Sequence, residues 1–453
     1  GRLTPQKWAL LLMAAGFLLR LAYILYTTVT QRQHDVWFFD NYKGHAGYIQ
    51  YLVDSNLRLP DFDPLSHWQF YHPPLHHLLA AAWMKLHLWL GFSVSRAQES
   101  IQVLTLFYSC ACMITGYKLL RLVKLRGLAL LVPFSLLCFH PTFIIMSGSI
   151  NNDILSITLA LGAILTALQW YRDPTIKNIL KIALCVGLSM SAKLSGVLVA
   201  PAIAVIFLVW LYRNRGTPGK CIKSFAAFAA VCFPLGLWWS IRNLVRFGTP
   251  VSYVPMFSDT DPQYIGNIPI LNRLFDFRPQ LFSSVFMAWG DGSAGYYEYN
   301  PVIGLLKTSM FGEFDLAASN ASITPAAVTL FIVNLLLVLL AVGCMACFLI
   351  KKTDKLDAPM KGFWGVLFGV QFLSYMQFCL IYAHTCTQNF RYMVPSLLVG
   401  LVFIGFLLQR LDEVPRDVKW KRNVANAVRA AITCAAVLFC SSSAYIYTIL
   451  SNK

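Results

Sequence analysis

The sequence has 453 residues, of which 57% are hydrophobic and only 13% are charged, and this composition excludes an ordinary soluble domain. Its formal net charge of +17 would suggest nucleic-acid binding in a soluble protein, but here the basic residues stand between long apolar runs. Cytoplasmic loops facing anionic lipid explain that pattern better. We therefore expect membrane lipids as partners and no nucleic acid.

Apolar runs of about 20 residues recur along the chain, which is the length that an α-helix needs to cross a hydrocarbon core. Arg2 and Lys7 precede the first run, so the positive-inside rule places the N-terminus in the cytoplasm. The sequence predicts an all-α polytopic membrane protein with about eleven transmembrane helices. We expect spans at 8–29, 101–120, 127–146, 150–170, 178–194, 198–213, 223–241, 326–350, 361–383, 391–409 and 427–448.

The segment Pro73–Phe92 is also long enough to cross a membrane, but it contains three histidines and a lysine. If it crossed, the basic cluster at 118–126 would lie on the outer side, against the positive-inside rule. We therefore predict an amphipathic juxtamembrane helix at the outer surface, with His76 and His77 at the level of the lipid headgroups.

We expect a single transmembrane domain over residues 1–453. Its first external loop, at 30–99, would carry catalytic residues and the juxtamembrane helix. A second long external loop would occupy 242–325, and 410–453 would hold a connector and the last span. The predicted topology puts both loops on the extracytoplasmic side.

Polar residues gather near the span ends on that side. Ionisable groups at membrane depth are costly, so we treat these as candidates for function. A different role is open for several, because Asp153 suits a helix N-cap and Lys193 and Arg391 suit snorkelling to the interface. The candidates are His34, Asp35, Asp40, His72, Asp153, Lys193, Glu313, Arg391 and Tyr392.

These residue types suit transfer of a group from a lipid-linked phosphate. A carboxylate in the first loop could take the proton from an acceptor hydroxyl as it attacks. Cations such as Lys193 and Arg391 could stabilise the charge that develops on the departing phosphate. None of the glycine-rich loops that hold nucleotide phosphates is present.

Seven segments occur in an order that resembles the GT-C glycosyltransferases. They are His34-Asp35 in the first loop, YHPPLHHLLAAAW, GSINNDILS, SAKLSG, RNLVRFGTPV, KTSMFGEF and NFRYMVP. The chain is similar in particular to family 39-like, polyprenyl-phosphate-sugar-dependent enzymes of bacteria, such as protein O-mannosyltransferases and the lipid A aminoarabinose transferase. The resemblance covers residues from about 5 to 410.

The resemblance implies a GT-C fold in which an acid of the first external loop is the catalytic base. That role falls on Asp35, with Asp40 as the fallback. His72 stands where some relatives have Lys or Glu-Lys, so its contact, to phosphate or to metal, stays open. Asp153 matches the acid after the second external turn, and Arg391 and Tyr392 match the pair at a late span.

No cofactor is required by these patterns, and a divalent metal held by Asp35, Asp153 and His72 is an open alternative. We expect an enzyme of the cytoplasmic membrane that transfers a monosaccharide from a polyprenyl-phosphate donor, with inversion, on the extracytoplasmic face. Its acceptor could be a protein, a glycan or a lipid. The alternatives are a scaffold and a transporter or flippase, although a transporter would need ionisable residues at mid-membrane and usually an internal repeat.

Overall fold

The computed structural model describes residues 4–288, 298–318, 320–415 and 418–450, so part of the predicted second external loop (289–297) lies outside the described residues. The described chain is helical, apart from one isolated bridge between Tyr264 and His384. Nine helices of this part are long and apolar enough to cross a membrane, which confirms the all-α polytopic class. They are Pro5–Tyr26, Val94–Leu122, Leu128–Gly148, Asp153–Arg172, Leu194–Arg213, Pro218–Phe247, Ala321–Ile350, Ala358–Ile381 and Lys419–Ile449.

The predicted count of eleven spans is not confirmed. The runs expected at 178–194 and 391–409 form α9 (Ile176–Ala192) and α16 (Ser396–Asp412), which have 17 residues each and are not among the nine. Arg391 and Tyr392 do not open α16 as expected, because they lie in the short 3-10 helix η8 (Phe390–Tyr392) before it.

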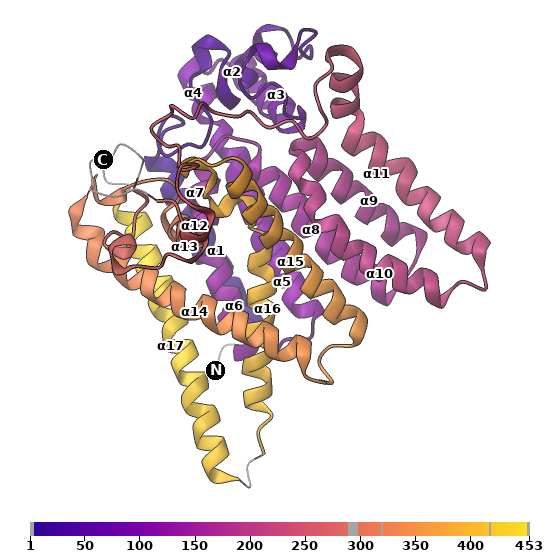
Figure 1. The fold of residues 1–453 in the computed structure, drawn as a ribbon, viewed down its shortest axis with the longest axis vertical. Coiled ribbons are helices and arrows are strands. Elements are labelled where there is room, and N and C mark those ends of the chain that lie inside the picture. Colours follow the sequence, from indigo (N-terminus) through magenta and orange to yellow (C-terminus); the bar gives the residue numbers. More distant parts are fainter. Residues whose placement is uncertain (1–3, 289–297, 319, 416–417, 451–453) are drawn as a thin grey trace. The chain divides into compact units, whose positions relative to one another are not determined.

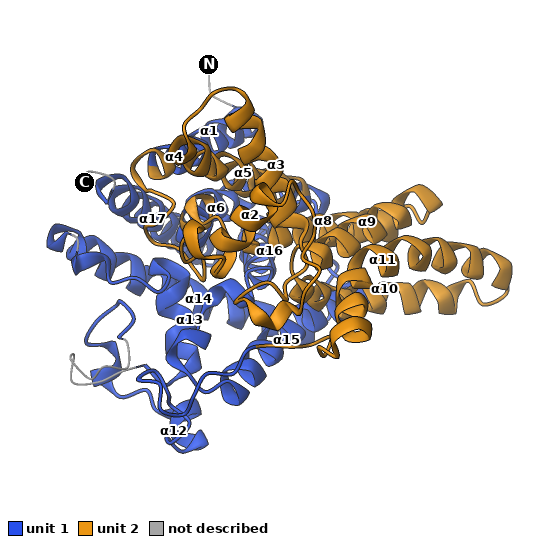
Figure 2. Cartoon of the chain, turned by 90° about the horizontal axis from the view of Figure 1, so that it is seen from above, with its two compact units in different colours: residues 1–22, 119–144, 255–453 blue, residues 23–118, 145–254 orange. Residues whose placement is uncertain are grey.

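Contacts along the chain define two compact units, and each is assembled from segments that are distant in sequence (Figure 2). Unit 1 comprises Gly1–Ala22, Leu119–Ile144 and Pro255–Lys453, and unit 2 comprises Tyr23–Lys118 and Ile145–Val254. The expectation of a single transmembrane domain over 1–453 stays a prediction.

Unit 2 is organised around α9, which packs against α8 (Asp153–Arg172) and α11 (Pro218–Phe247). Glycines allow the close approach of α9 and α11: a Cβ at Gly187 would lie 2.9 Å from the Leu235 side chain, and one at Gly236 would lie 2.8 Å from Met190 Sδ. The other helices of this unit are α2 (Gly44–Asp54), α3 (Leu75–Trp89), α4 (Val94–Glu99), α5 (Ile101–Leu122) and α10 (Ala200–Arg213). Figure 1 shows α2 and α3 together at one end of the α8–α11 group.

The helix α11 continues to Phe247, beyond the end predicted at 241. Basic side chains of its last turns contact the first loop. Arg246 forms an ion pair with Asp61, and Arg242 donates to the carbonyl of Pro60. These contacts tie the loop to the end of α11.

In unit 1, α14 (Thr324–Ile350), α16, α17 (Lys419–Ile449) and α6 (Leu128–Cys138) pack together. The other helices of this unit are α12 (Ile270–Phe275), α13 (Pro301–Phe311) and α15 (Ala358–Ile381). Three helices cross the division between the units: α1 (Pro5–Tyr26), α5, whose residues from Leu119 onward belong to unit 1, and α7 (Pro141–Gly148). The run expected as one span at 127–146 is interrupted between α6 and α7, where Pro141 has no N–H to continue the helix.

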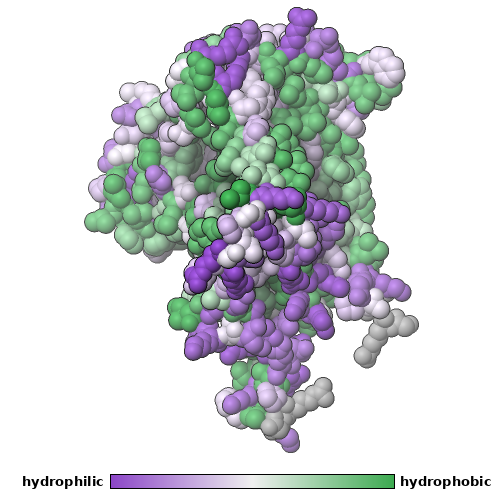
Figure 3. Space-filling model, turned by 90° about the vertical axis from the view of Figure 1, so that its right-hand side faces the viewer, coloured by the Kyte–Doolittle hydropathy of each residue, from purple (hydrophilic) through white to green (hydrophobic). Residues whose placement is uncertain are grey.

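The surface of the helices is apolar over wide areas. Figure 3 shows hydrophobic side chains spread broadly over one face, with hydrophilic side chains gathered in separate patches. On α11, Phe233, Ile241 and Val245 are exposed by 55%, 49% and 77%. Helices that present such side chains outward are suited to lipid contact.

Candidate functional site

The first loop of unit 2 folds over the N-terminus of α2. His45 and Ala46 donate their backbone N–H groups to the carbonyls of Asp35 and Val36, at 3.1 and 2.9 Å. Asp35 has a φ of 57°, in the left-handed region that non-glycine residues rarely adopt, and its side chain is half-buried. Gly44 has a φ of 69°, and a Cβ there would lie 2.5 Å from the Val36 oxygen. The loop conformation around Asp35 therefore depends on a glycine at position 44.

The GSINND segment holds this loop from the other side. Gln33 donates from Nε2 to the Gly148 carbonyl at 2.8 Å and accepts the Ile150 N–H at 3.0 Å. Asn151 donates from Nδ2 to the His34 carbonyl at 3.2 Å. The residue immediately before Asp35 is thus fixed to the turn that precedes α8.

The same turn carries an ion pair whose carboxylate is buried. Asp153 is only 3% exposed, and one of its carboxylate oxygens pairs with the ammonium of Lys193. Its other oxygen accepts from Asn151 Nδ2 at 3.0 Å, and Asn152 donates to the Ala192 carbonyl at 2.8 Å. Asn152, rather than Asp153, occupies the N-cap position of α8, and it makes no side-chain cap bond. The Asp153 carboxylate therefore does not serve as the predicted N-cap and instead holds Lys193.

Three of the segments singled out from the sequence, His34-Asp35, GSINNDILS and SAKLSG, meet through these contacts. We call Asp35, Asn151, Asp153 and Lys193 the α8 cluster. It combines the half-buried Asp35 carboxylate with the Asp153–Lys193 ion pair. The side-chain amide of Asn151 links the two, because it donates both to the backbone carbonyl of His34 and to the Asp153 carboxylate.

A column of aromatic rings lies beside the α8 cluster. His72 stacks on His45 with ring centroids 5.4 Å apart, and His45 stacks on His77 at 5.1 Å, with 2.9 Å between His45 Nδ1 and His77 Nε2. Tyr48 stacks on the other side of His77, with ring centroids 4.2 Å apart, and ends the column. Burial, together with the neighbouring imidazoles and the Lys193 charge, holds the pKa of His45 well below its ordinary value. Burial also holds the pKa of His77 well below its ordinary value, so His45 and His77 are neutral near pH 7.

The expectation that His76 and His77 lie among lipid headgroups is wrong, since both side chains are fully buried. His76 contacts the Ile150 carbonyl through Nε2 at 2.8 Å, and burial lowers its pKa to about 4. Their positions on α3 turn them toward α2 and the 148–150 turn, where aromatic stacking replaces contact with lipid.

Asp40, the fallback base, lies exposed on the short 3-10 helix η1 (Phe39–Asn41), with no hydrogen bond or ion pair to the α8 cluster among the described residues. The metal alternative also finds no support in side-chain placement. Within the described ranges, no three His, Cys, Asp or Glu side chains are arranged to hold a metal ion. Asp153 is committed to Lys193, and His72 stacks on His45.

The remaining candidates come together in unit 1. Glu313 accepts from Asn389 Nδ2 at 2.6 Å and lies 3.7 Å from Arg391 Nη2. Arg391 also donates to the Tyr392 hydroxyl at 2.8 Å, with its guanidinium 4.8 Å from the centre of the Tyr392 ring. We call these four residues the η8 cluster. KTSMFGEF and NFRYMVP, which are distant in sequence, thus join in one polar group.

Unit 1 contains a further ion pair that the sequence motifs did not predict. Lys307, in the KTSMFGEF segment, is fully buried and pairs with the fully buried Glu298, while its ammonium also donates to the Leu281 carbonyl at 2.7 Å. Burial raises the pKa of Glu298, against the lowering effect of Lys307. The signal available in the sequence was the lysine in the apolar run 301–311, since a buried lysine needs a partner.

No protein-family model matches this sequence, and no curated protein matches it. Solved structures do match it. The apo structure of the Archaeoglobus fulgidus oligosaccharyltransferase shares 14% sequence identity over 99% of this chain, with a TM-score of 0.50. A complex of the same archaeal protein with an inhibitory peptide and a dolichol-phosphate shares 13% identity over 98% of this chain and 55% of its own, with a TM-score of 0.44.

This likeness establishes the fold. The chain has the GT-C architecture that its motifs predicted. It covers 56% of the archaeal protein's length, so it spans little more than half of that neighbour.

Proposed function

We propose that this protein is a glycosyltransferase of the GT-C class, integral to the cytoplasmic membrane. It transfers a monosaccharide from a polyprenyl-phosphate donor to an acceptor on the extracytoplasmic face, with inversion at the sugar. The observation that carries the proposal is the α8 cluster, where a lysine held by a buried aspartate lies beside the loop that presents Asp35. The GT-C fold supports the class of reaction.

In this reaction the Asp35 carboxylate accepts the proton of the acceptor hydroxyl. The acceptor oxygen then forms a bond to the anomeric carbon as the bond from that carbon to the phosphate oxygen breaks. The Asp35 carboxylate is half-buried, so part of it remains accessible to an acceptor hydroxyl, as a general base requires.

Lys193 stabilises the phosphate as negative charge develops on it. Its ammonium has three N–H donors, and the buried carboxylate of Asp153 fixes its position before the substrate arrives. An ammonium that is already oriented needs no reorganisation during the reaction. His34 and His72 are proposed to contact the substrate from the same unit, with Asp40 as the fallback base.

In unit 1, Arg391, Tyr392 and Glu313 are proposed as further substrate contacts. Arg391 is suited to a phosphate, because its planar guanidinium can make two parallel hydrogen bonds. Glu313 and Tyr392 would hold that guanidinium in place.

The test is sugar transfer in proteoliposomes. Purified protein is given a panel of radiolabelled polyprenyl-phosphate sugars, with and without a chelator, and release of polyprenyl phosphate is followed. Asp35→Asn should lower turnover by about 10²- to 10⁴-fold while donor binding persists. Asp40→Asn, five positions along on the exposed η1, is the matched control and should stay near wild type.

Loss of turnover in Asp40→Asn alone would move the base to that residue. If no donor is consumed by the wild type, the glycosyltransferase proposal fails, and the transporter alternative is then tested by solute uptake.

A further inference from the structure

The connector between α5 and α6 is a folded turn with a fixed position. Lys124 and Gly127 both have positive φ, at 66° and 55°, and the Lys124 N–H donates to the Arg121 carbonyl at 3.0 Å. Leu125 is 1% exposed, and a Cβ at Gly405 of α16 would lie 2.3 Å from its Cδ1. Close packing of Leu125 against α16 therefore holds the basic residues on either side of it in place.

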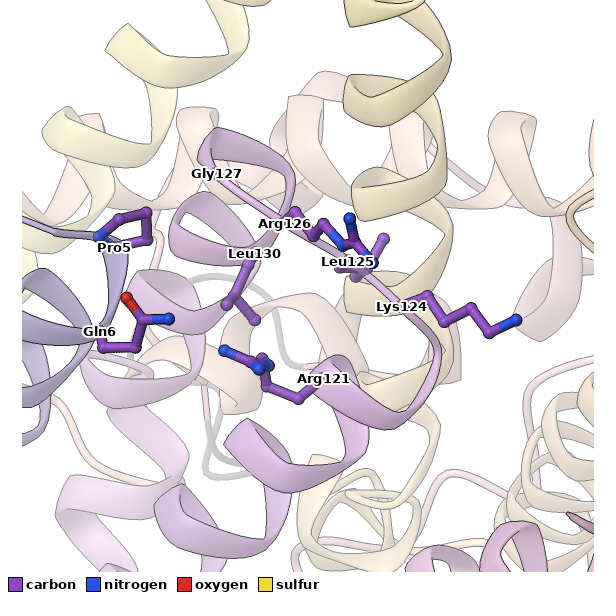
Figure 4. Close-up of a pocket in the computed structure, with 8 residues that line it drawn as sticks. All are labelled: Pro5, Gln6, Arg121, Lys124, Leu125, Arg126, Gly127 and Leu130. Atoms are coloured by element: carbon purple, nitrogen blue, oxygen red, sulfur yellow. The ribbon is translucent and has the colours of Figure 1, made fainter.

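A cavity of about 360 Å³ lies at this turn, within unit 1. Its lining includes the cations Arg121, Lys124 and Arg126, the amide of Gln6, and the apolar Leu130. In Figure 4, Arg121 and Gln6 extend toward one another beside Leu130, Arg126 lies over the connector, and Lys124 extends outward. The volume falls within the range of about 300–1,000 Å³ that is usual for small-molecule sites.

The side chains that line the cavity carry a strong positive charge. No acidic side chain lines it, and within the described ranges Arg121, Lys124 and Arg126 form no side-chain ion pair or hydrogen bond. Two helices begin beside the cavity. The helix α6 begins after its N-cap residue Gly127, which has no side chain to cap the helix, and α1 begins at Pro5. The partial positive charge of these two helix N-termini adds to that of the three cations.

The cavity lies at the ends of three helices that are each suited to cross a membrane. Pro5 begins α1, Arg121 is in the last turn of α5, and Leu128 begins α6. The ends of such helices lie at the level of the lipid headgroups. A ligand that reaches this cavity can therefore come from the bilayer itself.

We propose that this cavity binds the phosphate of an anionic membrane lipid. Arginine side chains bind phosphate oxygens through charge-assisted, often bidentate, hydrogen bonds, and basic pockets between membrane helices are suited to anionic headgroups. The lipid's glycerol and acyl groups would contact Leu130 and the apolar faces of α1 and α6. The site is distinct from both the α8 and the η8 clusters and does not depend on the proposed reaction.

Native mass spectrometry of the purified full-length chain in detergent tests this. Short-chain phosphatidylglycerol is titrated, with phosphatidylcholine as the neutral lipid and inorganic phosphate as the soluble anion. The triple variant Arg121→Gln/Lys124→Gln/Arg126→Gln should bind phosphatidylglycerol at least about tenfold more weakly than wild type. Phosphatidylcholine binding should not change.

A matched triple variant on the α10–α11 connector, Arg213→Gln/Arg215→Gln/Lys220→Gln, removes the same charge and should bind phosphatidylglycerol nearly as wild type does. If both triple variants lost phosphatidylglycerol affinity equally, the proposal would be overturned, because the lipid would then respond only to the net charge of the protein and not to the cavity. Unchanged binding in the cavity variant would overturn it as well.

Gln6→Trp keeps all three cations but fills part of the cavity, so it tests the site without altering charge. It should also weaken phosphatidylglycerol binding, and it covers the case in which the triple variant fails to fold. A third outcome is that the wild type binds inorganic phosphate as well as it binds phosphatidylglycerol, and that the variants abolish both. This would overturn the proposal of a lipid ligand and leave a site for free phosphate.

Discussion

Replacing Lys193 with methionine should destabilise the protein through the partner that it leaves behind. The Asp153 carboxylate is 3% exposed, so water cannot replace the lost ammonium, and the Asn151 amide on its other oxygen is a weaker partner. Removing one member of a buried ion pair costs roughly 3–5 kcal/mol. Because the Lys193 side chain is itself 15% exposed, we expect the lower end, about 3 kcal/mol of unfolding free energy.

The double variant Lys193→Met/Asp153→Asn should recover most of that loss. It removes both charges and keeps a side chain of the same shape at position 153, so its unfolding free energy should lie within about 1 kcal/mol of wild type. The difference between the single and double variants gives the coupling between the two residues.

Reversible chemical denaturation in mild detergent, followed by tryptophan fluorescence, measures these free energies. Lys85→Met is the matched control, because Lys85 is a half-buried lysine whose ammonium lies 3.5 Å from the Val53 carbonyl, and it should lose less than about 1 kcal/mol. A Lys193→Met protein as stable as this control would refute the reasoning. A stable but inactive double variant would assign Lys193 a role in the reaction beyond folding.

Three further predictions concern other parts of the chain. Lys307→Met should lower the unfolding free energy by about 3–5 kcal/mol, because Glu298 is fully buried, and Lys307→Met/Glu298→Gln should restore most of it in the same denaturation assay. Gly44→Ala should lower stability by about 1–3 kcal/mol and reduce sugar transfer, since an alanine side chain clashes with the first loop. Burial and neighbouring imidazoles lower the folded-state pKa of His45 and His77 below about 6.5, so stability should be constant above that pH and fall below it; denaturation between pH 7.5 and 5 should show this, and a flat profile would contradict it.

The transmembrane helices were largely predictable, because the length of an apolar run depends only on the bilayer. The exceptions have local causes. The break before Pro141 follows from one missing N–H. The helix α9 has the predicted length but ends at Ala192, before Lys193, and α16 begins only at Ser396, after the short helix that contains Arg391. These segments carry candidate site residues, so hydropathy alone misplaced the ends of the helices where the function is proposed.

The composition of the two clusters was also partly predictable. Charged residues at the ends of apolar runs on the same predicted side of the membrane are expected to lie near one another. Asp153 and Lys193 do form an ion pair. The histidine column was not predictable, because the pairing of His45 with His77 depends on how α2 and α3 align, and sequence spacing within one helix does not encode that. For the same reason, the pairing of Lys307 with Glu298 could not be predicted from the sequence.

Exposure separates the roles of three of the ion pairs in the described residues, those of Lys193, Lys307 and Arg391. Lys307 and Glu298 are both fully buried, so no substrate can reach the ammonium, and the pair can act only by fixing the 298–311 segment. Lys193 keeps 15% of its side chain exposed, and Arg391, at 5%, pairs with a Glu313 that is 16% exposed. Of these three ion pairs, those of Lys193 and Arg391 thus keep part of the pair exposed while the cation is held in a fixed orientation, which is what stabilisation of a departing phosphate requires.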